Sequence, residues 1–220
     1  MEEEKMTVEE AIAKTRPPKP LIPGDAAARK VVERFMAQEY FYQGIPLMNH
    51  CACQTLLILG EVWDLPCKDK LDWIAMGLQG GVCVGEICGT LSAAAVAMGL
   101  NAWKVLEPRT GYERRLATIA VSAYQQDLFF AFKRKFSQVH CLDILGLRES
   151  TPEEVSTFIR LRLWGNTCVP VLDYVIRTLC EWGESARELP PVPAMWRQRT
   201  KSEAVQETVK AEENLENIDK

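Results

Sequence analysis

Residues Gly80 to Gly89 read GGVCVGEICG, a glycine-rich segment that leads through Cys88 into a long run of small residues. Glycines permit a tight turn and a close approach of neighbouring backbones. The residues from about Glu86 to Val105 are rich in Ala and other small residues, which is typical of a helix that other helices approach closely. The segment therefore predicts a turn that delivers Cys88 into the first turn of a helix.

Cys88 would there lie near unpaired backbone amides and the positive end of the helix dipole, and both favour a thiolate. A thiolate binds metals and attacks disulfides, so the placement suits either chemistry. The simpler alternative is that Cys83 and Cys88 are only small residues at a crowded helix crossing.

The rest of the chain has a helical pattern almost throughout. No stretch of five or more residues alternates convincingly with strand formers. We expect an all-α bundle of six or seven helices with an irregular N-terminal arm and C-terminal tail. The expected helices cover residues 26–42, 50–62, 69–78, 86–105, 113–136, 152–163 and 167–182.

Prolines mark the expected domain boundaries. Residues 1–24 are predicted to form a proline-rich extended arm, residues 25–184 the helical cysteine-site domain, and residues 185–220 a charged, disordered tail. The prolines concerned are Pro17, Pro18, Pro20 and Pro23 in the arm and Pro190, Pro191 and Pro193 in the tail.

Composition excludes several classes of function. The net charge of -4 leaves no basic footprint for a phosphate backbone, so we expect no nucleic-acid partner. No signal-peptide core and no apolar run of spanning length occur, which predicts a cytoplasmic protein without membrane insertion. A chain of 220 residues can fold without covalent staples. Its eight cysteines are therefore better explained as metal ligands, redox thiols or small buried residues.

Three further cysteines lie near the ends of expected helices, as Cys88 does: Cys51, Cys141 and Cys168. Four cysteines so placed can converge at one end of a bundle, where thiolates are typical ligands of an iron-sulfur cluster or of zinc. Their spacing matches no compact ferredoxin or zinc-ribbon pattern, so it does not identify the metal.

From about residue 49 to residue 180 the sequence resembles the redox-active protein family named for its C, GCAxxG, C, C cysteine pattern. The resemblance is carried by four anchors in order: His50-Cys51-Ala52, Gly80-Gly81 with Gly85-Glu86-Ile87-Cys88-Gly89, Phe136 to Cys141 with Leu145-Gly146-Leu147, and the helix start at Cys168. It implies an iron-sulfur or dithiol redox role, with Cys51, Cys88, Cys141 and Cys168 as cluster ligands or reactive thiols.

Two departures from related proteins are visible. Related domains in split-Soret cytochromes lie beside covalently attached haem, but no Cys-x-x-Cys-His occurs here, so we expect no c-type haem. Thr90 stands where the family has a small residue, and Ala93 replaces a glycine. Both changes bear on how this helix packs.

Auxiliary candidates are Cys83, on the loop leading to Cys88, and His50 and His140, each directly before a family cysteine. An imidazole there could tune a cluster, replace a ligand or relay a proton, or simply lie at the surface. On the helix spacing, Cys53 should point away from Cys51, while Cys67 and Cys180 resemble ordinary thiols.

Three functions stay open at this point. The first is electron transfer through an iron-sulfur cluster, the second is thiol-disulfide exchange by the same cysteines, and the third is a structural zinc site in a helical scaffold. No phosphate loop, Ser-His-Asp motif or paired-carboxylate motif is present. We therefore expect an accessory electron carrier with a redox partner enzyme, compatible with a homodimer, rather than a stand-alone enzyme.

Overall fold

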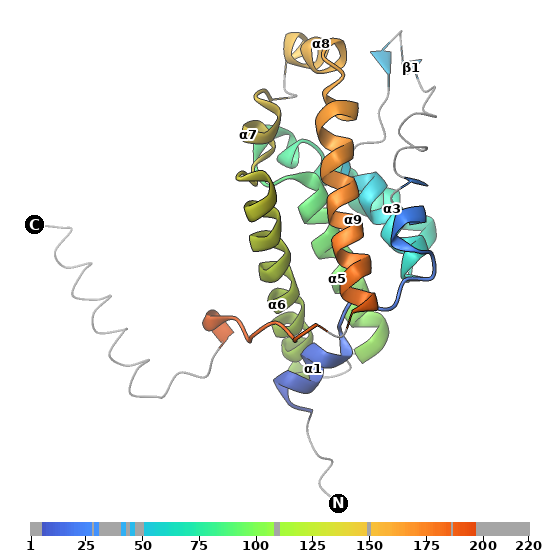
Figure 1. The fold of residues 1–220 in the computed structure, drawn as a ribbon, viewed down its shortest axis with the longest axis vertical. Coiled ribbons are helices and arrows are strands. Elements are labelled where there is room, and N and C mark those ends of the chain that lie inside the picture. The colour runs from blue at the N-terminus through green and yellow to red at the C-terminus, as the bar shows by residue number, and fades with distance from the viewer. Residues whose placement is uncertain are drawn as a thin grey trace, which may run out of the picture.

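The computed structural model describes residues 6–27, 29–30, 41–42, 45–46, 51–107, 111–148, 151–185 and 187–196, and in these ranges the fold is all-α, as predicted (Figure 1). The longer helices are α1 (Val8–Lys14), α3 (Cys51–Val62), α5 (Gly89–Leu106), α6 (Gly111–Phe136), α8 (Pro152–Arg160) and α9 (Val169–Glu184). Shorter ones are α4 (Leu71–Ala75) and α7 (Cys141–Leu145). The strands are the two-residue antiparallel pair β1 (Phe41–Tyr42) and β2 (Ile45–Pro46).

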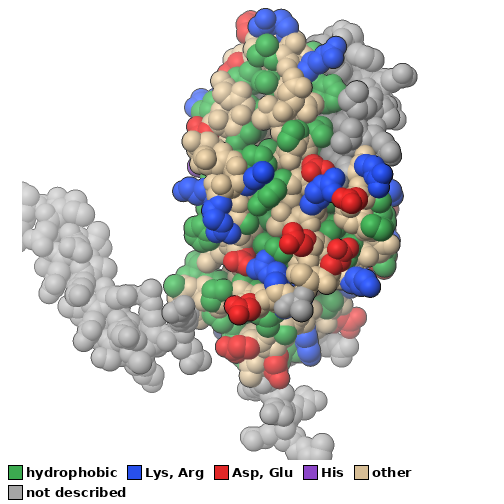
Figure 2. Space-filling view, in the orientation of Figure 1, with side chains coloured by type: hydrophobic (Ala, Val, Ile, Leu, Met, Phe, Trp, Pro, Cys, Tyr) green, Lys and Arg blue, Asp and Glu red, His purple; other side chains and the backbone are tan. Residues whose placement is uncertain are grey.

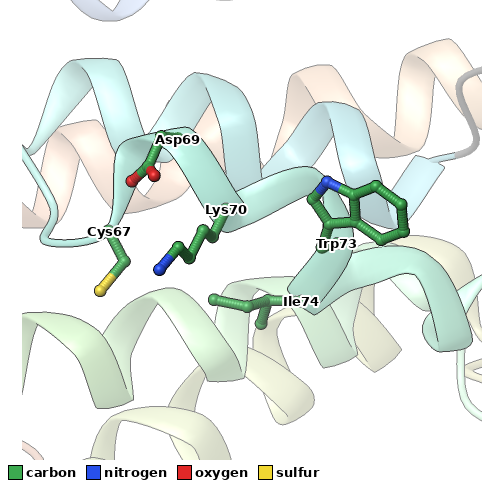
Figure 3. Close-up of a pocket in the computed structure, with 5 residues that line it drawn as sticks. All are labelled: Cys67, Asp69, Lys70, Trp73 and Ile74. Atoms are coloured by element: carbon green, nitrogen blue, oxygen red, sulfur yellow. The ribbon is translucent and has the colours of Figure 1, made fainter.

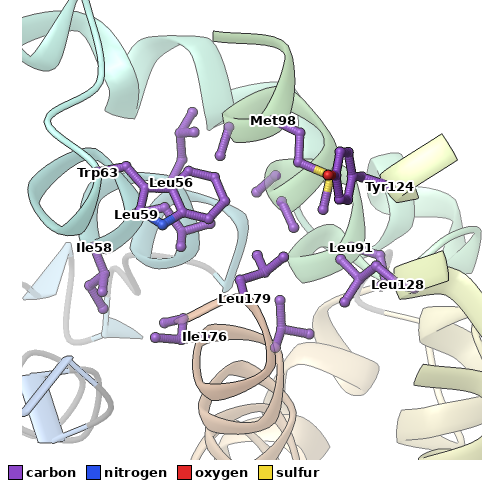
Figure 4. Packing of buried hydrophobic residues seen from close by; sticks show 14 of the residues in the cluster. Leu56, Ile58, Leu59, Trp63, Leu91, Met98, Tyr124, Leu128, Ile176 and Leu179 are labelled. Atoms are coloured by element: carbon purple, nitrogen blue, oxygen red, sulfur yellow. The ribbon is translucent and has the colours of Figure 1, made fainter. Parts of the chain in front are cut away.

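Helix α5 is the centre of the bundle, because α1, α3, α6 and α9 all contact it. Figure 4 shows the apolar side chains that meet there. They come from four helices and one adjoining turn: Leu56 and Leu59 of α3, Trp63 just after α3, Leu91 and Met98 of α5, Tyr124 and Leu128 of α6, and Ile176 and Leu179 of α9. Ala93, Ala94 and Ala97 on α5 are fully buried, which agrees with the close approach that its small residues predict.

The start of α8 follows the predicted signal. Thr151 is the N-cap and accepts a hydrogen bond from the Glu154 amide, while the Glu154 carboxylate accepts one from the Thr151 amide. Pro152 occupies the first turn, where its missing N–H has no intrahelical role. This capping box fixes the boundary of α8 from local sequence alone.

The N-terminal segment differs from the predicted extended arm. Helix α1 lies within it, capped by Thr7 and Glu10, and it buries Ala11 and Ile12 in the main core. The prolines that suggested an extended chain all follow this helix, so they did not exclude it. The described residues between the end of α1 and residue 24, which include the prolines, form no helix or strand.

The C-terminal segment also differs from the predicted disordered tail, as far as residue 196. Arg187 pairs with Asp127 of α6, and its guanidinium lies 3.9 Å from the ring centroid of Trp182. Pro190 and Pro193 are buried. Prolines restrict the chain to an extended form, which here packs on the bundle. Residues 197–220 of the predicted tail lie outside the described part.

The predicted helix over residues 26–42 falls mostly outside the described residues. Its described beginning is helical and attached to the bundle, through an ion pair of Asp25 with Arg177 and one of Lys30 with Glu61 at 2.7 Å. Charged side chains of both signs are interspersed over the face in Figure 2. None of the helices in the described ranges has the length and apolarity needed to cross a bilayer.

Gly183 sits where the N-terminal segment crosses α9, and this contact yields the first prediction. A Cβ atom on Gly183 would lie 2.1 Å from the Pro18 carbonyl oxygen, so Gly183→Ala must push the segment away. We expect this variant to lose about 1–3 kcal/mol of unfolding free energy in urea. Gly99→Ala is the control, because nothing lies within 4 Å of its Cβ position in α5. The control should gain about 0.5–1 kcal/mol, and equal changes in both variants would contradict the packing.

Candidate functional site

Two segments distant in sequence pair through their backbones beside the start of α5. The Cys88 amide donates to the Val139 carbonyl at 2.9 Å, and the Cys141 amide donates to the Glu86 carbonyl at 2.7 Å. Ile87 and His140 form the antiparallel bridge between these bonds. Cys88 and Cys141 are thus diagonal positions of the pair, and such positions share a face with Cα atoms about 7–8 Å apart.

The turn before this pairing is unusual. Gly80, Gly81, Val82 and Cys83 all have positive φ angles between 55° and 60°, so the chain makes a left-handed turn. The turn packs against α7, which begins at Cys141. The tight turn predicted from the glycines is therefore present, and it brings the chain into Cys88 beside the other cysteine segment.

Cys88 was predicted to lie in the first turn of its helix. It is instead the N-cap of α5, one residue before the helix begins. Cys88 is buried, with only 6% of the residue exposed. Burial raises the pKa of Cys88, because a thiolate loses its hydration there. The backbone amides of Thr90 and Leu91 and the Thr90 hydroxyl act in the opposite direction and are outweighed. The amides at the helix start therefore favour a thiolate, as predicted, but burial outweighs them and the pKa of Cys88 is raised.

Cys51 reaches the same place from α3, of which it is the first residue. A Cβ atom on Gly89 would lie 3.0 Å from the Cys51 sulfur and 2.6 Å from the Leu78 carbonyl oxygen. The half-buried Cys51 thiol therefore lies directly against the residue that follows Cys88. Only glycine allows this approach.

Cys168 is joined to Cys141 through a small apolar cluster. It ends the irregular turn Trp164–Cys168 that leads into α9. The cluster consists of Cys141, Leu145 and Phe158, with the half-buried Cys168 packed against it. Cys168 also packs against the main core, which contains Cys88. The four predicted cysteines are thus linked in the order Cys51, Cys88, Cys141 and Cys168.

Their sulfurs are nevertheless not arranged as a ready metal site. All eight cysteines are present as thiols. Across the residues that the structure describes, no three or more His, Cys, Asp or Glu side chains are grouped so as to hold a metal ion. The structure brings the four segments together, and the assignment of the four thiols as metal ligands stays a prediction.

The auxiliary candidates lie in different settings. His140 Nδ1 is 3.3 Å from the Glu86 carboxylate, and both side chains are exposed, so this pair faces solvent at the edge of the pairing. Cys83 is exposed, with the Gln79 amide nitrogen 3.7 Å from its sulfur. His50 lies outside the described residues.

The remaining thiols, Cys53, Cys67 and Cys180, lie in different settings. Cys53 is buried two residues after Cys51. Cys67 is exposed and lines a surface pocket with Asp69, Lys70, Trp73 and Ile74, where Figure 3 shows the Lys70 amine on the same side as the Cys67 sulfur. Cys180 is 1% exposed, and burial together with the Glu184 charge raises its pKa to about 11.

These differences predict the order in which iodoacetamide modifies the thiols of the folded, reduced protein at pH 8. Cys67 and Cys83 should react first, because both are exposed. Cys88 and Cys180 should react last, since both are buried, and a thiol of pKa 11 is ionised to only about one part in a thousand at pH 8. Peptide mass spectrometry measures the order, and the urea-unfolded protein is the control. Early labelling of Cys180 would contradict the described packing.

Comparison with known proteins identifies the same region. The family model described as "Putative redox-active protein (C_GCAxxG_C_C)" matches residues 49–181, more than half of the chain. No curated protein and no solved structure matches. The matched range begins just before Cys51 and contains all four linked cysteines. The chain belongs to the C_GCAxxG_C_C redox-active protein family.

Proposed function

We propose that the protein is an electron carrier whose redox centre is an iron-sulfur cluster held by Cys51, Cys88, Cys141 and Cys168. The observation that carries the proposal is the backbone pairing of residues 86–88 with residues 139–141. The contact of Cys51 with Gly89 and the apolar cluster of Cys141 and Cys168 extend it to all four thiols.

The chemistry of the donors fits such a cluster. Iron-sulfur clusters are held by cysteine thiolates, and hydrogen bonds to the sulfurs tune their potential. Two backbone amides and one hydroxyl at the start of α5 act to lower the pKa of Cys88. When bound, a cluster would supply one-electron chemistry. Since no such group of donors is assembled among the described residues, binding requires the sulfurs to approach one another.

Burial favours electron transfer over thiol-disulfide exchange. Exchange needs a thiolate that a substrate disulfide can reach. Cys88 and Cys141 are only 6% and 7% exposed, and the pKa of Cys88 is raised by burial. An electron can enter a buried centre without contact between sulfur and substrate. A structural zinc site uses the same donors, and metal analysis separates it from a cluster.

A carrier of this kind acts with a partner. The described residues contain no arrangement that we assign to an organic substrate, so the proposal includes a redox enzyme that exchanges electrons with the site. A homodimer is compatible with it. The exposed pair of His140 and Glu86 marks where residues 86–88 and 139–141 reach the surface.

Anaerobic purification after iron-replete expression tests the proposal. We expect brown protein with iron and sulfide in comparable amounts and an electron paramagnetic resonance signal after reduction. Cys88→Ser should lose both iron and signal, because it removes the donor at the centre of the linked cysteines. Cys67→Ser is the matched control, since its exposed thiol lies outside that set, and it should keep both. Colourless, iron-free wild-type protein would contradict the proposal, and bound zinc without a redox-dependent spectrum would favour the structural alternative.

A further inference from the structure

A surface pocket of about 590 Å³ lies beside Cys67, which is outside the set of four linked cysteines. Its lining residues are Cys67, Asp69, Lys70, Trp73 and Ile74 (Figure 3). The volume is within the range of pockets that hold small molecules. Trp73 is 69% exposed and Ile74 is 41% exposed, so the pocket presents large apolar side chains to solvent. Apolar side chains gathered in this way are candidates for contact with a ligand.

One short turn places the side chains of Cys67 and Lys70 beside each other. Cys67 is the N-cap of a 3₁₀ helix, Lys68–Lys70, and the Lys70 amide donates to the Cys67 carbonyl at 2.9 Å. Side chains three residues apart are eclipsed in such a helix. Figure 3 accordingly shows the Lys70 amine on the same side as the Cys67 sulfur. The pocket therefore combines an exposed thiol with a cationic group.

Two charges of opposite sign line the pocket without partners of their own. Nearby, Lys68 and Lys104 both pair with Asp64, so those charges compensate one another. Among the described residues, the side chains of Asp69 and Lys70 have neither an ion pair nor a hydrogen bond, and they do not pair with each other. A ligand that carries both an ammonium group and a carboxylate complements these two charges.

We propose that Cys67 is a site of reversible modification by a small amino-acid disulfide, each half of which carries an ammonium group and a carboxylate. The Cys67 thiol gives its proton to solvent, and the thiolate attacks one sulfur of the disulfide. The S–S bond of the small molecule breaks, and a new S–S bond joins Cys67 to one half of it. The other half leaves as a thiolate and takes a proton from water. Cys67 is thereby oxidised, and the leaving half is reduced.

Each residue of the pocket has a role in this modification. The Lys70 ammonium group pairs with the carboxylate of the attached half, and the Asp69 carboxylate pairs with its ammonium group. Trp73 and Ile74 cover its aliphatic part. The modification is stoichiometric and is reversed by a thiol reductant. It goes beyond the proposed electron-carrier function and does not depend on it, because Cys67 is none of the four proposed ligands.

The test follows mixed-disulfide formation at Cys67 in the full-length reduced protein at pH 7, by peptide mass spectrometry. The probes are L-cystine, with zwitterionic halves, and three disulfides of other charge: dithiodipropionate (anionic), cystamine (cationic) and bis(2-hydroxyethyl) disulfide (neutral). Each rate at Cys67 is divided by the rate at the exposed Cys83 in the same sample, which cancels the intrinsic reactivity of each disulfide. We expect this ratio to be about threefold higher for L-cystine than for the other probes, as exposed charge pairs contribute modestly.

Variants of the two charges test their roles. Lys70→Gln and Asp69→Asn should each lower the preference for L-cystine over the neutral disulfide by about threefold. Comparison with the neutral probe also accounts for any change in the ionisation of Cys67. Lys68→Gln is the matched control and should keep the preference, because Lys68 pairs with Asp64 and does not line the pocket. All three substitutions are at exposed residues, so we expect the fold to be kept.

Several results would overturn the proposal. They are an absence of modification at Cys67, equal ratios for the four disulfides, and a preference for L-cystine that survives both Lys70→Gln and Asp69→Asn. A preference for dithiodipropionate that only Lys70→Gln removes would also overturn it, because the pocket would then select an anion. A loss of preference in Lys68→Gln equal to that in Lys70→Gln would contradict the assigned pairing. None of these outcomes depends on whether the protein carries iron.

Discussion

Two backbone hydrogen bonds, from Cys88 to Val139 and from Cys141 to Glu86, are the constraint on which the arrangement of the site depends. Each such bond contributes only about 0.5–1.5 kcal/mol net, so the pairing needs the surrounding helices to hold it. Helix α5, which begins directly after Cys88, supports the pairing through its contacts with the other helices of the bundle. Helix α7, which begins at Cys141, supports it by packing against the left-handed turn. The local pairing and the global packing thus depend on each other.

The same packing sets the chemistry of the thiols. Burial that brings Cys88 and Cys141 together also removes the water that a thiolate needs, and the pKa of Cys88 rises as a result. Hydrogen-bond donors at the start of α5 reduce this cost without cancelling it. The positive charge of a bound metal cation would stabilise a buried thiolate. Buried thiols of this kind therefore suit metal ligation better than exchange with a substrate disulfide.

The sequence predicted the parts of the fold that local rules govern. The capping box at Thr151 and the small residues of α5 each have a local signature, and both appear in the structure. Helix α1 was not predicted, although Thr7 and Glu10 form the same kind of capping box as Thr151 and Glu154, because the prolines that follow it favoured an extended chain. The packed segment around Arg187 was also missed, since its partners Asp127 and Trp182 lie on other elements.

The site shows the same division between local and non-local information. That Cys51, Cys88, Cys141 and Cys168 lie near the ends of elements could be predicted from capping residues and glycines. The pairing of Cys88 with Val139 could not, because a single bridge leaves no alternating pattern in sequence. The raised pKa of Cys88 depends on burial from several helices, which no short motif encodes.

The most direct test of one shared centre is iron K-edge X-ray absorption of the anaerobically purified protein. The account predicts a first coordination shell made of sulfur, with an iron–iron scattering path from neighbouring irons of a cluster. A first shell of oxygen or nitrogen, or a sulfur shell that is the same in wild type and in Cys88→Ser, would contradict it.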